Sequence, residues 1–287
     1  MRVKKYLKIV KPSVKGSIMV LFGIFNSRLG IGIEIFTINL IYGPLAYLFI
    51  AFSGIMVIKL LQILDNPSHD SKLSKKRAIM LFGVLYLIGF ILTIGNVIDN
   101  IAIYYLNIPI LILTCLIGIF WCLFGFIGFK YRKNIIFVSI LIETLVFTIG
   151  LIYGAFLNTY LIPYFIYFFF LSISFLQLSR ELLKGFNGKK KTENLMEGKI
   201  RYNQQNILRY SFISEILAGF FLIVSIFLNI SDSIWFLLLM IFGIVVVIFA
   251  GILTFESILE KKISYKIYSI LKFGILIELI ILLLIGS

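Results

Sequence analysis

The chain has 287 residues, of which 61% are hydrophobic and only 14% are charged, and its formal net charge is +14 at pH 7. A soluble domain is closer to half apolar, so this composition excludes an ordinary globular enzyme or binding domain. The positive charge is spread over several short segments and not gathered in one patch, which argues against nucleic acid as a partner.

Nine apolar segments follow one another along the chain. Each is close to the roughly 20 residues that an α-helix needs to cross a bilayer. We expect membrane-spanning helices at residues 14–31, 36–62, 78–97, 108–128, 134–156, 161–183, 206–229, 233–256 and 267–285. The sequence therefore predicts an all-α membrane protein whose nine transmembrane helices form one bundle, a single polytopic domain over residues 1–287.

The basic residues alternate with these segments. Of the 27 Lys and Arg residues, 26 lie in five stretches, at residues 1–15, 59–77, 130–133, 180–209 and 261–272. The connections between those stretches, on the other side of the bilayer, carry none. Because basic loops stay on the cytoplasmic side during insertion, the pattern predicts a multi-pass protein of the cell membrane. The N-terminus is expected in the cytoplasm and the C-terminus outside.

Two of the basic loops also carry other polar residues in a regular pattern. After the second span, Gln62, Asn66 and Asp70 follow one another at intervals of four, with Asp65 beside them, and Arg77 closes the loop. At the end of the sixth span the chain reads Arg-Glu-Leu-Leu-Lys, from residue 180 to 184. Loops held by a rigid scaffold often carry function, so we expect the chemistry on this side of the membrane.

In these two segments the chain resembles the UbiA superfamily of intramembrane prenyltransferases. That family has nine transmembrane helices, an NxxxDxxxD motif at the inner end of helix 2 and a second aspartate motif at the inner end of helix 6. Residues 6–12 are similar to the family's opening, with a basic residue and a proline before helix 1. The resemblance implies a UbiA-like bundle that transfers an isoprenyl group from a prenyl diphosphate to an aromatic or lipid acceptor.

The resemblance also implies roles for individual residues, with membrane lipids, an isoprenyl diphosphate and a hydrophobic acceptor as partners. Mg²⁺ prefers carboxylate ligands and the phosphate oxygens of a substrate. The catalytic residues would be Asp70, Asn66 and Asp65; the diphosphate-binding residues Arg77, Arg180 and Lys184; and the metal ligands Asp70, Asp65 and Glu181. Plainer alternatives are that the two aspartates are solvated loop residues and that the cations anchor helix ends at the headgroups.

The chain departs from the family's motifs at several positions. Gln62 replaces the first Asn, Asn66 replaces an Asp, and Gly185 to Lys189 replace the acids of the second motif. Amide oxygens can coordinate Mg²⁺ but cannot neutralise its charge, so the site is weakened. A second hypothesis is therefore a non-catalytic protein of the same fold that binds or translocates an isoprenoid or another lipid.

Three carboxylates, Glu143, Glu215 and Glu278, lie inside predicted spans. A charged group there costs at least about 2.5 kcal/mol, so it normally faces a cavity or a partner. We expect Glu143, Tyr210 and Glu215 to line a polar cavity, unless the glutamates are protonated structural residues. The same carboxylates support a third hypothesis, an unrelated membrane transporter.

Overall fold

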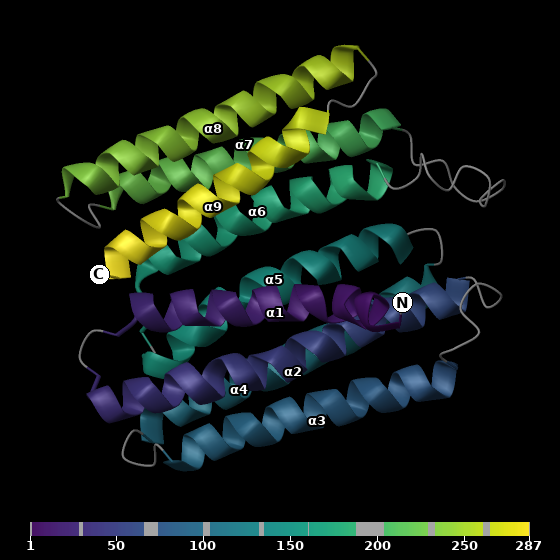
Figure 1. Ribbon diagram of the computed structural model, residues 1–287, viewed down its shortest axis with the longest axis vertical. Helices are drawn as coiled ribbons and strands as arrows, with labels where there is room; N and C mark the ends of the chain where they lie inside the picture. Colours follow the sequence, from purple (N-terminus) through teal and green to yellow (C-terminus); the bar gives the residue numbers. More distant parts are fainter. Residues whose placement is uncertain are drawn as a thin grey trace. The chain divides into compact units, whose positions relative to one another are not determined.

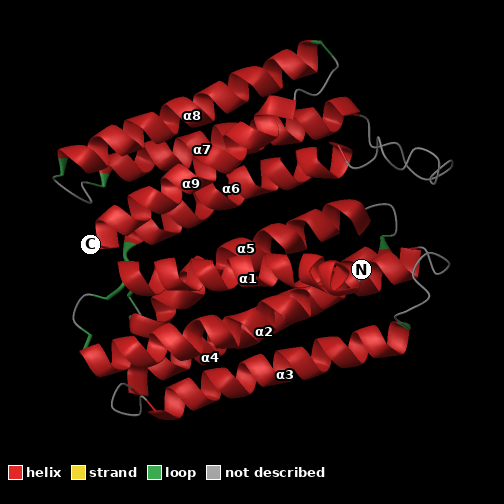
Figure 2. Cartoon of the chain, in the orientation of Figure 1, coloured by secondary structure: helices red, strands yellow, loops and turns green. Residues whose placement is uncertain are grey.

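The computed structural model describes residues 2–28, 31–65, 74–99, 104–131, 135–159, 161–187, 204–228, 233–260 and 265–286. Within these ranges it contains nine α-helices and no strand (Figures 1 and 2). They are α1 (Arg2–Asn26), α2 (Ile33–Asp65), α3 (Lys75–Asp99), α4 (Tyr104–Lys130), α5 (Ile135–Asn158), α6 (Tyr164–Asn187), α7 (Gln204–Phe227), α8 (Ile234–Leu259) and α9 (Tyr265–Gly286). The predicted all-α fold is confirmed, and the predicted ends of α2–α9 differ from these bounds by at most four residues.

The predicted bounds of α1 were wrong. The helix begins at Arg2 and not near residue 14, because it continues through the basic segment that precedes its apolar part. Pro12 lies inside it and removes one N–H donor without ending the helix. At the other end α1 stops at Asn26, and the carbonyl of Ile24 in its last turn accepts a hydrogen bond from the side chain of Asn158 at 2.7 Å. A helix end leaves such carbonyls without an intrahelical donor, so this bond satisfies one of them.

In the part of the chain described above, eight helices, α2–α9, are long and apolar enough to cross a membrane. The first half of α1 carries most of the basic residues of its segment, which leaves its apolar half short. These lengths and compositions confirm a multi-pass helical membrane protein.

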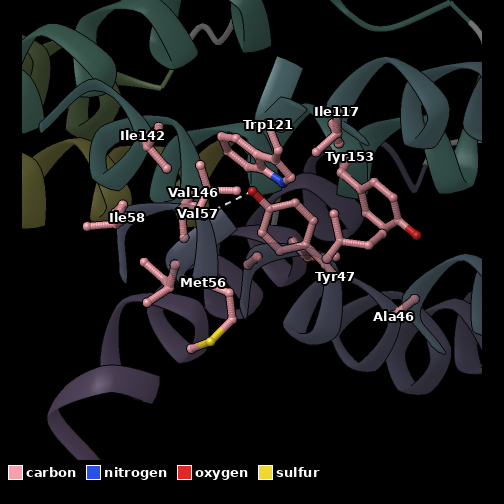
Figure 3. Close-up of a cluster of buried hydrophobic side chains, with 14 of the residues drawn as sticks. Ala46, Tyr47, Met56, Val57, Ile58, Ile117, Trp121, Ile142, Val146 and Tyr153 are labelled. Atoms are coloured by element: carbon pink, nitrogen blue, oxygen red, sulfur yellow. Dashed lines mark hydrogen bonds between the residues drawn. The ribbon is translucent and has the colours of Figure 1, made fainter. Parts of the chain in front are cut away.

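Residues 1–163 form one compact unit, built from α1–α5. Here α2 packs against α1, α3, α4 and α5, and α1 packs along α5. Figure 3 shows the centre of this unit, where Tyr47, Trp121 and Tyr153 are fully buried. The Tyr47 hydroxyl donates to the carbonyl of Val146 at 2.9 Å, and the Tyr47 and Tyr153 rings lie 5.3 Å apart. The Tyr153 hydroxyl lies 2.8 Å from that of Thr93, so each buried tyrosine finds a partner for its polar end, as an apolar core requires.

The contact between α1 and α5 depends on glycine. A Cβ atom on Gly23 would lie 2.1 Å from the carbonyl oxygen of Leu151, and one on Gly154 would lie 2.1 Å from that of Val20. Gly16 and Gly150 meet the opposite helix in the same way, at 2.3 Å. Small residues let helix backbones approach closely inside a membrane, where burial of apolar surface does not drive association.

Two buried asparagines join three helices at one end of this unit. The side-chain amide of Asn39 on α2 donates to the carbonyl of Leu157 at 2.9 Å and to Oδ1 of Asn158 at 2.8 Å. Asn158 on α5 in turn donates to Ile24 on α1. Because both asparagines are buried, this chain of bonds fixes the relative positions of α1, α2 and α5.

Residues 164–287 form the second compact unit, built from α6–α9. In it α7 packs against α6 and α8, and α9 packs against the same two helices. Its interior contains several buried polar side chains, among them Ser172, Gln177, Ser179, Glu215 and Glu278.

Candidate functional site

The first predicted motif lies at the end of α2. Asp65 is the last residue of that helix and is partly exposed, whereas Asn66 and Asp70 lie outside the described residues. One turn earlier, Gln62 accepts a hydrogen bond from the ammonium group of Lys59 at 2.9 Å, on the exposed side of the helix. The structure therefore places one of the three predicted acidic or amide residues, at a helix end.

Arg77 lies in the first turn of α3 and is exposed. Its backbone N–H donates to the hydroxyl of Ser74 at 3.3 Å, the pattern of a serine at a helix N-cap. Asp65 and Arg77 lie on the consecutive helices α2 and α3, which pack against each other in the same unit. The role of Arg77 in binding a diphosphate stays a prediction.

At the end of α6 the second predicted segment forms a compact ionic cluster. The carboxylate of Glu181 accepts hydrogen bonds at Oε1 from Arg180 Nη2 and from Gln177 Nε2, both at 3.0 Å. At Oε2 it accepts from Lys184 Nζ at 2.6 Å. Arg180 and Glu181 are buried, and the Lys184 side chain is about half exposed. One carboxylate thus holds two cations on a single helix turn.

The Arg180 guanidinium also lies over the ring of Tyr268 on α9, 5.5 Å from its centroid. Its Nη2 is bound to Glu181, but its buried Nε has no hydrogen-bond partner in the structure. Oε1 of Gln177 is likewise buried without a partner. Buried polar atoms normally have partners, so these two mark a place where a ligand group could bind.

The surroundings of Glu181 do not fit a Mg²⁺ ligand. Both carboxylate oxygens already accept hydrogen bonds from cationic or amide donors, and two positive charges lie within 3.0 Å of them. A divalent cation would be repelled by both cations. Among the residues that the structure places, no group of three His, Cys, Asp or Glu side chains could hold a metal ion.

Glu215 on α7 is buried among hydroxyl groups from three helices. Its Oε1 accepts from Ser179 on α6 at 2.7 Å, from Ser211 at 3.1 Å and from Thr254 on α8 at 3.1 Å. Its other oxygen, Oε2, is buried without a hydrogen-bond partner. The predicted neighbour Tyr210 is instead half exposed, 51% of its surface being accessible. Its predicted place beside Glu215 in a polar cavity stays a prediction.

Glu143 is partly exposed on α5, in the first unit, whereas Glu215 belongs to the second. The cavity that we expect them to share therefore stays a prediction. The third membrane carboxylate, Glu278 on α9, is buried and lies 2.7 Å from the Ser172 hydroxyl, which also contacts the carbonyl of Ala218 at 3.0 Å. It joins α9 to α6 inside the second unit.

Comparison with known proteins shows which solved structure has a similar fold. No protein-family model matches the sequence, and no curated protein matches it. Among solved structures, the chain matches digeranylgeranylglyceryl phosphate synthase, a UbiA-type membrane prenyltransferase, with a TM-score of 0.69 and 18% sequence identity. The match covers 100% of this chain and 99% of that chain. The chain therefore has the fold of that protein. The predicted resemblance to the UbiA fold is thereby confirmed.

Sequence reasoning missed four residues of the two buried clusters in α6–α9, three of them on a helix other than that of their partner. Ser179 and Thr254 bind Glu215, and Tyr268 lies against Arg180, yet each comes from a helix other than that of its partner. No spacing rule links them along the chain, because helix periodicity relates residues of one helix only. Gln177, by contrast, lies four residues before Glu181 and could have been found from that spacing.

Proposed function

We propose that the protein is a membrane prenyltransferase of the UbiA kind, which transfers an isoprenyl group from a prenyl diphosphate to an aromatic or lipid acceptor. The observation that carries the proposal is the likeness in fold to digeranylgeranylglyceryl phosphate synthase along the whole length of both chains. Three basic residues support it, since cationic donors suit a diphosphate: Arg77 lies in the first turn of α3, Lys184 in the last turn of α6, and Arg180 one turn before Lys184.

In the reaction, the bond between the allylic carbon and the diphosphate oxygen breaks, and its electron pair leaves with the diphosphate. A nucleophilic atom of the acceptor then bonds to the allylic carbon and loses a proton. Arg77, Arg180 and Lys184 would bind the diphosphate oxygens and stabilise the charge that develops on the leaving group. The apolar helices would enclose the isoprenoid tail and exclude water from the cation.

Mg²⁺, where bound, neutralises negative charge on a diphosphate leaving group. We propose that it binds at the end of α2, with Asp65, Asn66 and Asp70 as ligands. Asp65 fits such a role, because it is a partly exposed carboxylate at a helix end. We also place the protein in the cell membrane, with this end of α2 facing the cytoplasm.

The test uses purified protein in lipid nanodiscs with Mg²⁺ and a radiolabelled long-chain prenyl diphosphate. Quinone-type ring, tetrapyrrole and glycerol-phosphate lipid acceptors are supplied one at a time. With one acceptor class we expect a product in which the labelled prenyl group is bonded to the acceptor and the pyrophosphate has been released. We expect loss of turnover in Asp70→Asn. No transfer and no hydrolysis with any acceptor would contradict the proposal.

A second function, binding or translocation of an isoprenoid lipid without catalysis, is favoured by the ion-paired state of Glu181. It requires lipid binding that does not depend on Mg²⁺ and that survives Asp70→Ala. Strict dependence of lipid binding on the metal would exclude it.

A further inference from the structure

The end of α6 has the charge of an anion site and not that of a metal site. Arg180 and Lys184 contribute two positive charges, and Glu181 between them contributes one negative charge. The two cations hold the carboxylate from both sides, at 3.0 and 2.6 Å. A cluster with a net positive charge attracts phosphate oxygens and repels a divalent cation.

The geometry of the cluster is also fixed before any ligand binds. Glu181 is 3% exposed and Arg180 is 7% exposed, so neither side chain is free to rearrange in solvent. Tyr268 supports the face of the guanidinium, and Gln177 holds Oε1 of Glu181. Ordering these long side chains in advance removes an entropic cost that a ligand would otherwise meet.

A donor remains unused in this ordered cluster. Nε of Arg180 is buried and has no hydrogen-bond partner in the structure. An arginine presents its donors in a planar fork that suits two oxygens of one phosphate group. A buried donor without a partner costs free energy, and a phosphate oxygen would remove that cost.

We propose that the end of α6 binds a phosphate group directly through Arg180 and Lys184, without a metal ion, and that Glu181 is a positioning residue that holds these cations. This rests on the proposed function and alters it at one point. The proposed metal ion stays at the end of α2, whereas at the end of α6 side-chain cations take the place of a metal ion. The phosphate belongs either to the prenyl diphosphate or to a phosphate headgroup of the acceptor lipid.

A positioning role and a metal-ligand role for Glu181 predict opposite effects of Glu181→Gln on anion binding. Binding measurements therefore test the proposal. The protein in phosphatidylcholine nanodiscs is titrated with inorganic pyrophosphate in EDTA and again in Mg²⁺, by equilibrium dialysis. Glycerol 3-phosphate is titrated in parallel as the soluble form of a lipid headgroup. We expect one of the two anions to bind in EDTA, and the one that binds identifies the source of the phosphate.

Two variants separate the roles. Lys184→Met is expected to weaken anion binding in EDTA by roughly tenfold or more, as for the loss of one charge-assisted hydrogen bond. Glu181→Gln is expected to strengthen it several-fold, because the amide oxygen of glutamine can still accept from the cations while the negative charge of Glu181 is removed. A metal ligand would behave in the opposite way, with binding lost in Glu181→Gln. Lys130→Met, an exposed lysine at the end of α4, is the matched control and is expected to change nothing.

Glu181→Gln leaves Arg180 buried beside a neutral group, so its thermal unfolding is measured first. Should that variant fail to fold, Lys184→Met decides alone, since its side chain is half exposed. Anion binding that appears only with Mg²⁺ would overturn this inference and leave the prenyltransferase proposal standing. Absence of binding in both conditions would overturn the two together.

Discussion

Oγ of Ser179 lies 2.7 Å from Oε1 of Glu215, and this contact joins α6 to α7 inside the second unit. Ser211 and Thr254 donate to the same carboxylate oxygen, so one atom organises hydroxyl groups from three helices. Inside a bilayer no water competes for these groups, and each must find its partner within the protein.

The first prediction concerns the acceptor that these hydroxyl groups share. Glu215→Leu removes it and leaves buried hydroxyl groups with fewer partners, which costs about 1–3 kcal/mol for each group left unsatisfied. Glu215→Gln keeps an amide oxygen for the same donors, so it is expected to unfold closer to the wild type. Thermal unfolding in detergent compares the two variants. A Leu variant as stable as the Gln variant would show that Oε1 does not organise the cluster.

The second prediction concerns the backbone contact of α1 with α5. Gly154→Ala places a methyl group against the carbonyl of Val20, and such overpacking is expected to destabilise the first unit by about 1–3 kcal/mol. Gly83→Ala on α3 is the control, because a Cβ there meets nothing within 4 Å. Denaturation in mild detergent measures both. Equal stability of the two variants would mean that α1 and α5 can separate without loss.

The third prediction concerns the asparagine pair. Asn158→Leu removes one of the two acceptors of Asn39 and the donor to Ile24, so we expect a loss of about 2 kcal/mol or more, the cost of buried polar groups that lose a partner. Thr37→Val serves as the control, since that exposed hydroxyl donates within its own helix turn, to the carbonyl of Ile33. Limited proteolysis in detergent reports the stability of both variants. Comparable cleavage rates would contradict the prediction.

The fourth prediction follows from the proposed function. Arg77→Met is expected to weaken binding of a prenyl diphosphate by roughly tenfold, the effect of one lost charge-assisted hydrogen bond. Its unfolding temperature should stay unchanged, because Arg77 is exposed. Lys76→Met, the neighbouring exposed residue, is the control, and fluorescence competition with a labelled prenyl diphosphate provides the measurement. The same affinity in both variants would remove Arg77 from the site.

The helices could be predicted from the sequence because one property, the length of each apolar segment, determines where they form. A segment of about 20 apolar residues has few alternatives to a spanning helix, and basic residues mark where it leaves the membrane. That signal reports membrane depth and not helix length, which is why it placed the start of α1 at residue 14 and not at Arg2. Charge alone could not show that the helix continues beyond its apolar part.

The candidate site could be predicted only in part. The sequence singles out residues 180–184, and the structure places Arg180, Glu181 and Lys184 of that segment in one ionic cluster. The sequence could not indicate that Glu181 would be satisfied by its own neighbours, since that depends on side-chain choice among several partners. The partners of Glu215 on α6 and α8 depend on how helices pack, which sequence spacing does not contain.

The glycine contact between α1 and α5 has a consequence for biogenesis. Gly16 and Gly23 emerge from the ribosome well before Gly150 and Gly154, so three other helices are inserted between the two halves of this contact. A nascent chain that has delivered only α1–α4 still lacks the surface against which these glycines close. The first unit therefore completes its assembly only after α5 has left the translocon, however early α1 itself is inserted.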